Sequence, residues 1–341
     1  MLYYYAIKNK VMEQKIGNFF RAFLSMLYMG LLNFFVFFGF SNHYSSGTFV
    51  LENFQEQYNS GVYQFRLIST KLIGWLYQIL DKTNIDFSSY PVHFLNPDAD
   101  IKLYWAFFIY TTFFAMLTLL VMNVFLNNEK ITVRDPYRIL ILLFAATIIA
   151  ISQFVIVPYD TFAYFMLVLF ALVFIRFLQR KQPGLNFFLM CLFIIIGTAN
   201  RETMALALSL AAALLLSERG IGKDSFWPLV VLVALFIGTY ISLRIFFHAS
   251  VTHDSSLFAQ NFTNPKNIAG LVFGVILLIL PLLMATRYEQ KKFILFFYVA
   301  SLPYILFCLA VGILFEVRLF VPVFLIAMLL STFSMQHGRL N

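Results

Sequence analysis

Apolar residues occur in long, nearly uninterrupted runs along most of this chain, and polar residues gather in short stretches between them. A helix needs about 20 apolar residues to cross the hydrocarbon layer of a membrane, a length that these runs approach or exceed. The pattern predicts an all-α, polytopic transmembrane helix bundle of about ten spans in a single domain, 1–341. The expected spans are roughly 22–40, 103–126, 138–157, 161–178, 185–199, 203–217, 226–247, 268–286, 293–314 and 318–335.

Two of these runs, 185–199 and 203–217, are short and meet at Asn200-Arg201-Glu202. They form either two complete spans or one broken hairpin. Both forms return the chain to the same side of the membrane, so the sides of the later loops do not depend on the choice.

Composition excludes the soluble alternatives. Of the 341 residues, 61% are hydrophobic and 12% are charged, about half the charged share of a typical soluble domain. A soluble globule could not cover so much apolar surface, because much of any folded surface must face water. The two cysteines, Cys191 and Cys308, lie inside apolar runs and are expected to be buried thiols.

The distribution of basic residues predicts the orientation. Lysine and arginine favour the cytoplasmic side of a membrane protein. A cytoplasmic N-terminus places sixteen of the 24 lysines and arginines on the inner side and eight on the outer side. The C-terminus is then also cytoplasmic, and 1–21 is expected to lie on the cytoplasmic surface as an interfacial segment.

The first outer loop, about 41–101, is long, and the remaining spans follow in 103–335. Within this loop, the segment 62–80 carries apolar residues at helical spacing with polar residues between them. This pattern predicts an amphipathic helix that lies in the outer membrane interface. Its apolar positions are Phe65, Ile68, Leu72, Trp75 and Ile79.

Acidic residues break the pattern that the bases set, because ten of the sixteen fall on the outer side. Asp160, Glu202 and Glu316 sit in very short loops against the ends of spans, and Arg201 and Arg318 lie beside two of them. Ionisable groups at the edge of lipid are costly, so they tend to be paired or functional. A structural ion pair explains any one of the three equally well, but three acids on one face favour a site.

An outer membrane surface that carries both acids and arginines suits the binding of a lipid-linked phosphosugar. A carboxylate accepts the proton of an attacking hydroxyl, and arginines stabilise the departing phosphate. Glu52 or Glu56 supplies the carboxylate, and Arg66, Arg201 and Arg318 supply the arginines. The spans themselves hold few polar residues, which disfavours an ion-coupled transporter.

The chain resembles the GT-C superfamily of polyprenyl-phosphate-sugar-dependent glycosyltransferases. The shared features are a first span, a long outer loop with an acid and an interfacial helix, and many further spans with short loops. The chain lacks that family's usual pair of acids soon after the first span. The resemblance covers most of the chain and is carried locally by Tyr63-Gln64-Phe65-Arg66-Leu67, Tyr159-Asp160, Asn200-Arg201-Glu202-Thr203 and Glu316-Val317-Arg318.

The resemblance implies an inverting glycosyltransferase in the cytoplasmic membrane of a bacterium, with its active site on the periplasmic side. The donor is a polyprenyl-phosphate sugar and the acceptor a cell-surface glycan or glycolipid. The expected base is Glu56 or Glu52, with Glu56 preferred because it lies nearer Arg66. Arg66, Arg201 and Arg318 are expected to bind phosphate. Asp160, Glu202 and Glu316 are expected to orient the arginines, bind sugar hydroxyls or hold a divalent cation (Mg²⁺ or Mn²⁺).

Three other functions stay open. An O-antigen-type polysaccharide polymerase or ligase also acts on outer lipid-linked sugars, but its large outer loop usually lies in the second half of the chain. A non-enzymatic flippase for lipid-linked sugars would bind phosphate without needing a base. A membrane scaffold predicts that no single outer acid matters.

Overall fold

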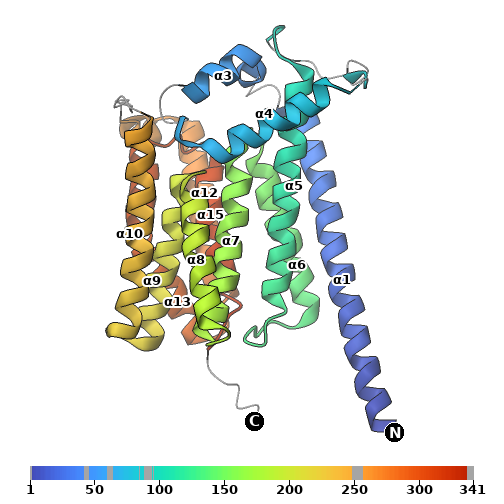
Figure 1. Ribbon diagram of the computed structural model, residues 1–341, viewed down its shortest axis with the longest axis vertical. Coiled ribbons are helices and arrows are strands. Elements are labelled where there is room, and N and C mark those ends of the chain that lie inside the picture. The colour runs from blue at the N-terminus through green and yellow to red at the C-terminus, as the bar shows by residue number, and fades with distance from the viewer. Residues whose placement is uncertain are drawn as a thin grey trace.

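The computed structural model describes residues 2–41, 46–59, 64–83, 85–87, 94, 96–247 and 256–335. Over these residues the chain is helical, and the only extended pairing is an isolated antiparallel bridge between Ile131 and Phe333. The long helices stand side by side in one bundle (Figure 1), which confirms the all-α class. The elements are α1 (Leu2–Val36), η1 (Phe37–Ser41), η2 (Ser46–Phe49), α3 (Leu51–Asn59), α4 (Leu67–Asp81), α5 (Ile101–Leu126), α6 (Asp135–Ser152), α7 (Pro158–Leu178), α8 (Pro183–Thr198), η5 (Glu202–Met204), α9 (Ala205–Arg219), α10 (Lys223–Phe246), α11 (Phe258–Thr263), α12 (Pro265–Met284), α13 (Tyr288–Ala300), α14 (Leu302–Val311), η6 (Val317–Leu319) and α15 (Val321–Leu330).

In the described part of the chain, six helices are long and apolar enough to cross a membrane. They are α1 from Ile16 onward, α5, α6, α7, α10 and α12. The pair α13 and α14 makes a seventh if it counts as one span, although it bends by 51° between the two helices. The other expected spans, 185–199, 203–217 and 318–335, form helices too, but these helices are short.

The short helices end where the chain becomes charged. With a rise of 1.5 Å per residue, the 16 residues of α8 cover about 24 Å and the 10 residues of α15 about 15 Å, less than the roughly 30 Å of hydrocarbon. Helix α8 stops just before Arg201, and α15 starts just after Arg318. The chain leaves the helical path at these points and brings ionisable side chains into the bundle.

Helix α7 is the central helix. In the most apolar 18-residue stretch of α7, 83% of the residues are buried, whereas in that of α10, at the periphery, 6% are buried. It packs against α5, α8, α9 and α15. Because Asp160 lies in the first turn of α7, that carboxylate is buried among the helices that pack on α7, at one end of the bundle.

Helices α3 and α4 lie across one end of the bundle (Figure 1), called here the α4 end. The expected amphipathic helix is present and begins at Leu67; residues 62–63 lie outside the described residues. Ser69 and Ile73 are its buried positions, whereas Trp75 and Ile79 are exposed. The helix turns its Ser69 side to the bundle, so part of the predicted apolar stripe faces outward, as an interfacial helix requires.

Residues 2–21, expected to lie along the cytoplasmic surface, form instead the first part of α1, which extends past the end of the bundle opposite α4 (Figure 1). Arg21 fixes this helix to its neighbours. Its guanidinium donates to Asn123 at 2.7 Å and Asn18 at 2.8 Å and forms an ion pair with Asp135 at 3.3 Å. The buried arginine therefore joins α1 to α5 and α6.

Candidate functional site

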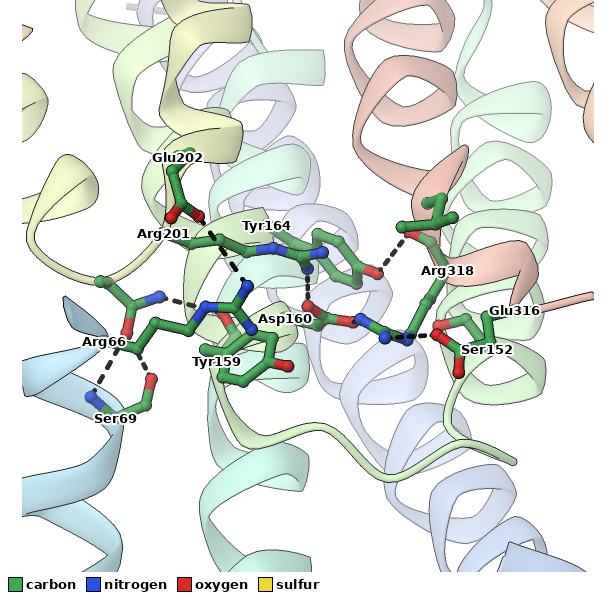
Figure 2. Close-up of polar contacts among 12 residues, drawn as sticks. Arg66, Ser69, Ser152, Tyr159, Asp160, Tyr164, Arg201, Glu202, Glu316 and Arg318 are labelled. Carbon is green, nitrogen blue, oxygen red and sulfur yellow. Dashed lines mark hydrogen bonds and ion pairs between the residues drawn. The ribbon is translucent and has the colours of Figure 1, made fainter. Parts of the chain in front are cut away.

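Asp160 binds two arginines that come from distant parts of the sequence. Its carboxylate forms ion pairs with Arg201, from the loop after α8, and with Arg318 of η6, whose Nη1 lies 3.1 Å from Oδ2 (Figure 2). All three residues are buried, and Asp160 has no exposed surface. Buried charges of this kind persist only when they are paired.

Glu316 completes a buried group of two acids and two arginines. It forms an ion pair with Arg318, and the hydroxyl of Tyr164 donates to the backbone oxygen of Arg318 at 3.2 Å. Burial lowers the pKa of Arg201 to about 10, which leaves it protonated at neutral pH. The group, called here the buried quartet, is Asp160, Arg201, Glu316 and Arg318, and its formal charge is zero.

Local sequence places each member of the quartet. Pro158 occupies the first turn of α7, where its missing N–H costs nothing, and Asp160 follows where a helix dipole favours an acid. Arg201 has extended backbone with φ −164°. The loop that carries Glu316 is held against α12, because Asn267 accepts a hydrogen bond from the backbone N–H of Phe315 at 3.3 Å.

A second group of charges lies beside the quartet and reaches the surface. The two carboxylate oxygens of Glu202 each face one arginine, Arg66 at 3.9 Å and Arg244 at 3.9 Å. The Arg66 guanidinium stacks 3.6 Å above the ring of Tyr159, the residue before Asp160 (Figure 2). The ring of Tyr159 also lies 5.2 Å from the Arg201 guanidinium, so it separates the two groups.

Asn200 connects α4 to this site. Its side-chain oxygen accepts from the hydroxyl and the backbone N–H of Ser69, and its amide donates to the backbone oxygen of Tyr159 at 2.9 Å. The backbone N–H of Leu67 donates to Ala199 at 3.2 Å. These bonds fix the first turn of α4, and therefore Arg66, over α7 and the loop after α8.

The structure brings together six of the eight residues singled out from the sequence: Arg66, Asp160, Arg201, Glu202, Glu316 and Arg318. With Arg244 they are called here the charged cluster. Glu52 and Glu56 lie on α3, where both are exposed, and α3 lies beyond α4 at the end of the bundle (Figure 1). Their role as the base stays a prediction.

Sequence reasoning did not assign Arg244 to the site. It belongs to the last turn of α10, and no acid adjoins it in the sequence. Its partner, Glu202, comes from another connection. Tyr159 was noted only as the neighbour of Asp160, and no sequence signal gives its stacking on Arg66.

The acids of the cluster do not fit a divalent cation. Each carboxylate faces at least one arginine, which repels a cation, and in the described residues no three acid, histidine or cysteine side chains gather around one point. An apolar hollow of about 520 Å³ lies elsewhere, along α10, where the small residues Ala234, Gly238 and Ser242 leave space. It reaches the last turn of α10, the turn that also carries Arg244.

Comparison with known proteins adds no relative: the chain matches no protein-family model, no curated protein and no solved structure. The interpretation of the charged cluster therefore depends on its own residues and geometry.

Proposed function

We propose that this chain is a membrane glycosyltransferase that moves a sugar from a polyprenyl-phosphate carrier to a cell-surface glycan or glycolipid. It acts as a bundle of about ten membrane-inserted segments, some of them short, in the bacterial cytoplasmic membrane with the α4 end outward. The observation that carries the proposal is the convergence of four arginines and three acids from α4, α7, α10 and two loops at one end of an apolar bundle.

The reaction needs charge of both signs at a membrane interface. The acceptor hydroxyl attacks the anomeric carbon, the bond from that carbon to the phosphate oxygen breaks, and the configuration inverts. The proton passes to a carboxylate, and the prenyl phosphate leaves as an anion that arginines stabilise. The cluster has one more arginine than it has acids, which suits an anionic leaving group.

The parts of the cluster differ in role. The quartet is buried and internally paired, so Asp160 and Glu316 orient Arg201 and Arg318 and hold their guanidiniums in place. Glu202 and Arg244 are partly exposed, and Arg66 lies beside Glu202 with less of its side chain exposed. The acids in reach of an acceptor are Glu202 in the cluster and Glu52 and Glu56 on α3.

The hydrophobic part of the donor needs an apolar surface beside the cluster. The hollow along α10 ends at the turn of Arg244, so a prenyl chain lying along α10 has its head at the level of the cluster. Helix α4, with Trp75 and Ile79 exposed, supports the same end at the headgroup layer.

The test is turnover by the purified chain in detergent. The chain is incubated with a panel of short-chain prenyl-phosphate hexoses and pentoses and a bacterial glycolipid extract, and the released prenyl phosphate is measured. Release by the wild type, and its loss in Glu52→Gln, Glu56→Gln or the double variant with donor binding kept, supports the transferase and identifies the base. No release with any donor contradicts it.

A lipid-linked-sugar carrier is the second candidate. The 51° bend between α13 and α14 and the helices that end inside the bundle are features that transporters use. A carrier tolerates Glu52→Gln and Glu56→Gln and moves a fluorescent prenyl-phosphate sugar between leaflets of a vesicle, whereas the transferase does not.

A further inference from the structure

Glu202 lies between two arginines without a close contact to either. Its nearest distances to Arg66 Nη2 and Arg244 Nη2 are both 3.9 Å, longer than the 2.7–3.2 Å of an N–H···O hydrogen bond. Each carboxylate oxygen faces a different guanidinium. Charge attraction, rather than directed hydrogen bonds, therefore holds this carboxylate between them.

Glu202 and Arg244 are the accessible part of the charged cluster. Their side chains are 33% and 31% exposed, whereas that of Arg66 is 12% exposed and Asp160 is fully buried. Exposed, long ion pairs contribute little to stability, so moving Glu202 away costs little. An anion that approaches from the surface meets Arg244 and Glu202 before it meets Asp160.

Aromatic rings hold both guanidiniums in place. Arg66 lies 3.6 Å above the ring of Tyr159, and Arg244 lies 3.5 Å above the ring of Tyr240 and 4.6 Å from that of Phe65. Stacking engages the face of a guanidinium, whereas an anion is bound by the N–H groups at its edge, so the two contacts are compatible. Arginines that are already ordered bind an anion at a lower entropic cost.

The charges match a phosphate better than a carboxylate. Arg66 and Arg244 each carry one positive charge, and the Glu202 carboxylate between them carries one negative charge. A phosphate monoester carries nearly two negative charges and more oxygens, and it accepts bidentate bonds from arginine. A phosphate between these arginines therefore offers them more negative charge and more acceptor oxygens than Glu202 does.

We infer that Arg66 and Arg244 form a phosphate site, and that the carboxylate of Glu202 occupies this site until a phosphate group displaces it. The inference deepens the proposed function and depends on it for one point, that the phosphate belongs to a prenyl lipid. Displacement also releases Glu202 beside the bound phosphate, where it can accept a hydrogen bond from a sugar or acceptor hydroxyl.

Isothermal titration of the full chain in a phosphate-free maltoside detergent tests the inference, with farnesyl phosphate, inorganic phosphate and farnesol as probes. Arg66→Gln and Arg244→Gln are expected to weaken farnesyl phosphate binding by about tenfold or more. Arg244→Lys keeps the positive charge but loses the bidentate hydrogen bonding of the guanidinium, and it is expected to weaken farnesyl phosphate binding less. Glu202→Gln removes the competing anion and is expected to tighten it by at least about threefold.

Matched controls separate the site from general charge. Lys266→Gln and Asp98→Asn remove the same charges at exposed positions at and near the α4 end and are expected to leave affinity within about twofold. Unchanged or weaker binding by Glu202→Gln, with an unchanged thermal midpoint, overturns the inference. So does a loss of affinity in Lys266→Gln equal to that in Arg244→Gln.

The outcomes also separate this inference from the proposed function. If inorganic phosphate binds as tightly as farnesyl phosphate and with the same response to the variants, the phosphate site stands and the lipid donor loses its support. If the chain turns over its donor but Glu202→Gln leaves the affinity for farnesyl phosphate unchanged, the transferase proposal stands and the displacement of the carboxylate is wrong. If farnesol binds and neither farnesyl phosphate nor inorganic phosphate does, both the phosphate site and the transferase proposal are contradicted.

Discussion

Replacing Asp160 with asparagine tests whether the buried quartet holds the bundle together. Asparagine has nearly the shape of aspartate, so the variant removes one negative charge and leaves packing unchanged. Arg318 keeps Glu316 as a partner, but Arg201 loses its ion pair and stays buried. An uncompensated buried guanidinium must then be hydrated or moved, and either change disrupts the first turn of α7.

The expected loss is large for a single isosteric change. Removing one partner of a buried ion pair costs about 3–5 kcal/mol, and Asp160, with no exposed surface, belongs at the upper part of that range. The exposed acid Asp98 provides the control, because its replacement by asparagine is expected to change stability by no more than about 0.5 kcal/mol.

Equilibrium unfolding in mixed detergent, followed by far-ultraviolet circular dichroism, measures both variants. The double variant Asp160→Asn with Arg201→Gln restores neutrality and is expected to recover part of the lost stability, which a double-mutant cycle reports as coupling. A loss below about 1 kcal/mol for Asp160→Asn, or strict additivity in the cycle, would refute the view that the quartet is a tightly coupled ion network.

Two further predictions concern the supports of the cluster and of α1. In Gly270→Ala the new Cβ would lie 2.0 Å from the backbone oxygen of Leu314, so the loop carrying Glu316 must shift. We expect a loss of about 1–3 kcal/mol together with weaker farnesyl phosphate binding. Gly17→Ala in α1, where a Cβ meets nothing within 4 Å, is the control, and equal behaviour of the two variants would contradict the prediction. Arg21→Gln removes the buried guanidinium that joins α1 to α5 and α6, and we expect a destabilisation of about 2–4 kcal/mol with faster proteolysis of α1; unchanged proteolysis contradicts it.

The sequence predicted the helices well because an apolar run of this length leaves the backbone few alternatives. It predicted the number of complete spans less well. Hydropathy reports how apolar a stretch is, but not where its helix begins and ends. Helix α8 ends just before Arg201 and α15 begins just after Arg318, because the backbone is not α-helical where it places these two side chains inside the bundle. The prediction of an amphipathic helix was confirmed, but contacts with the bundle, and not the apolar stripe alone, decide which side of α4 is buried.

The partners within the charged cluster could not be predicted in the same way. Arg201 and Glu202 are neighbours in sequence, yet Arg201 pairs with Asp160, while Glu202 faces Arg66 and Arg244. The extended backbone at Arg201 explains this, because successive side chains of an extended chain point in opposite directions. Glu316 and Arg318, two residues apart, do pair.

The amino-acid sequence by itself determined a helical, membrane-type bundle and the concentration of acids and arginines in its short connections, since both follow from local apolarity and the cost of charge near lipid. Only the tertiary structure decided which charges are buried and which are accessible. Those properties depend on packing between segments as far apart in sequence as α4, α7, α10 and η6, and no local pattern records the distance between them.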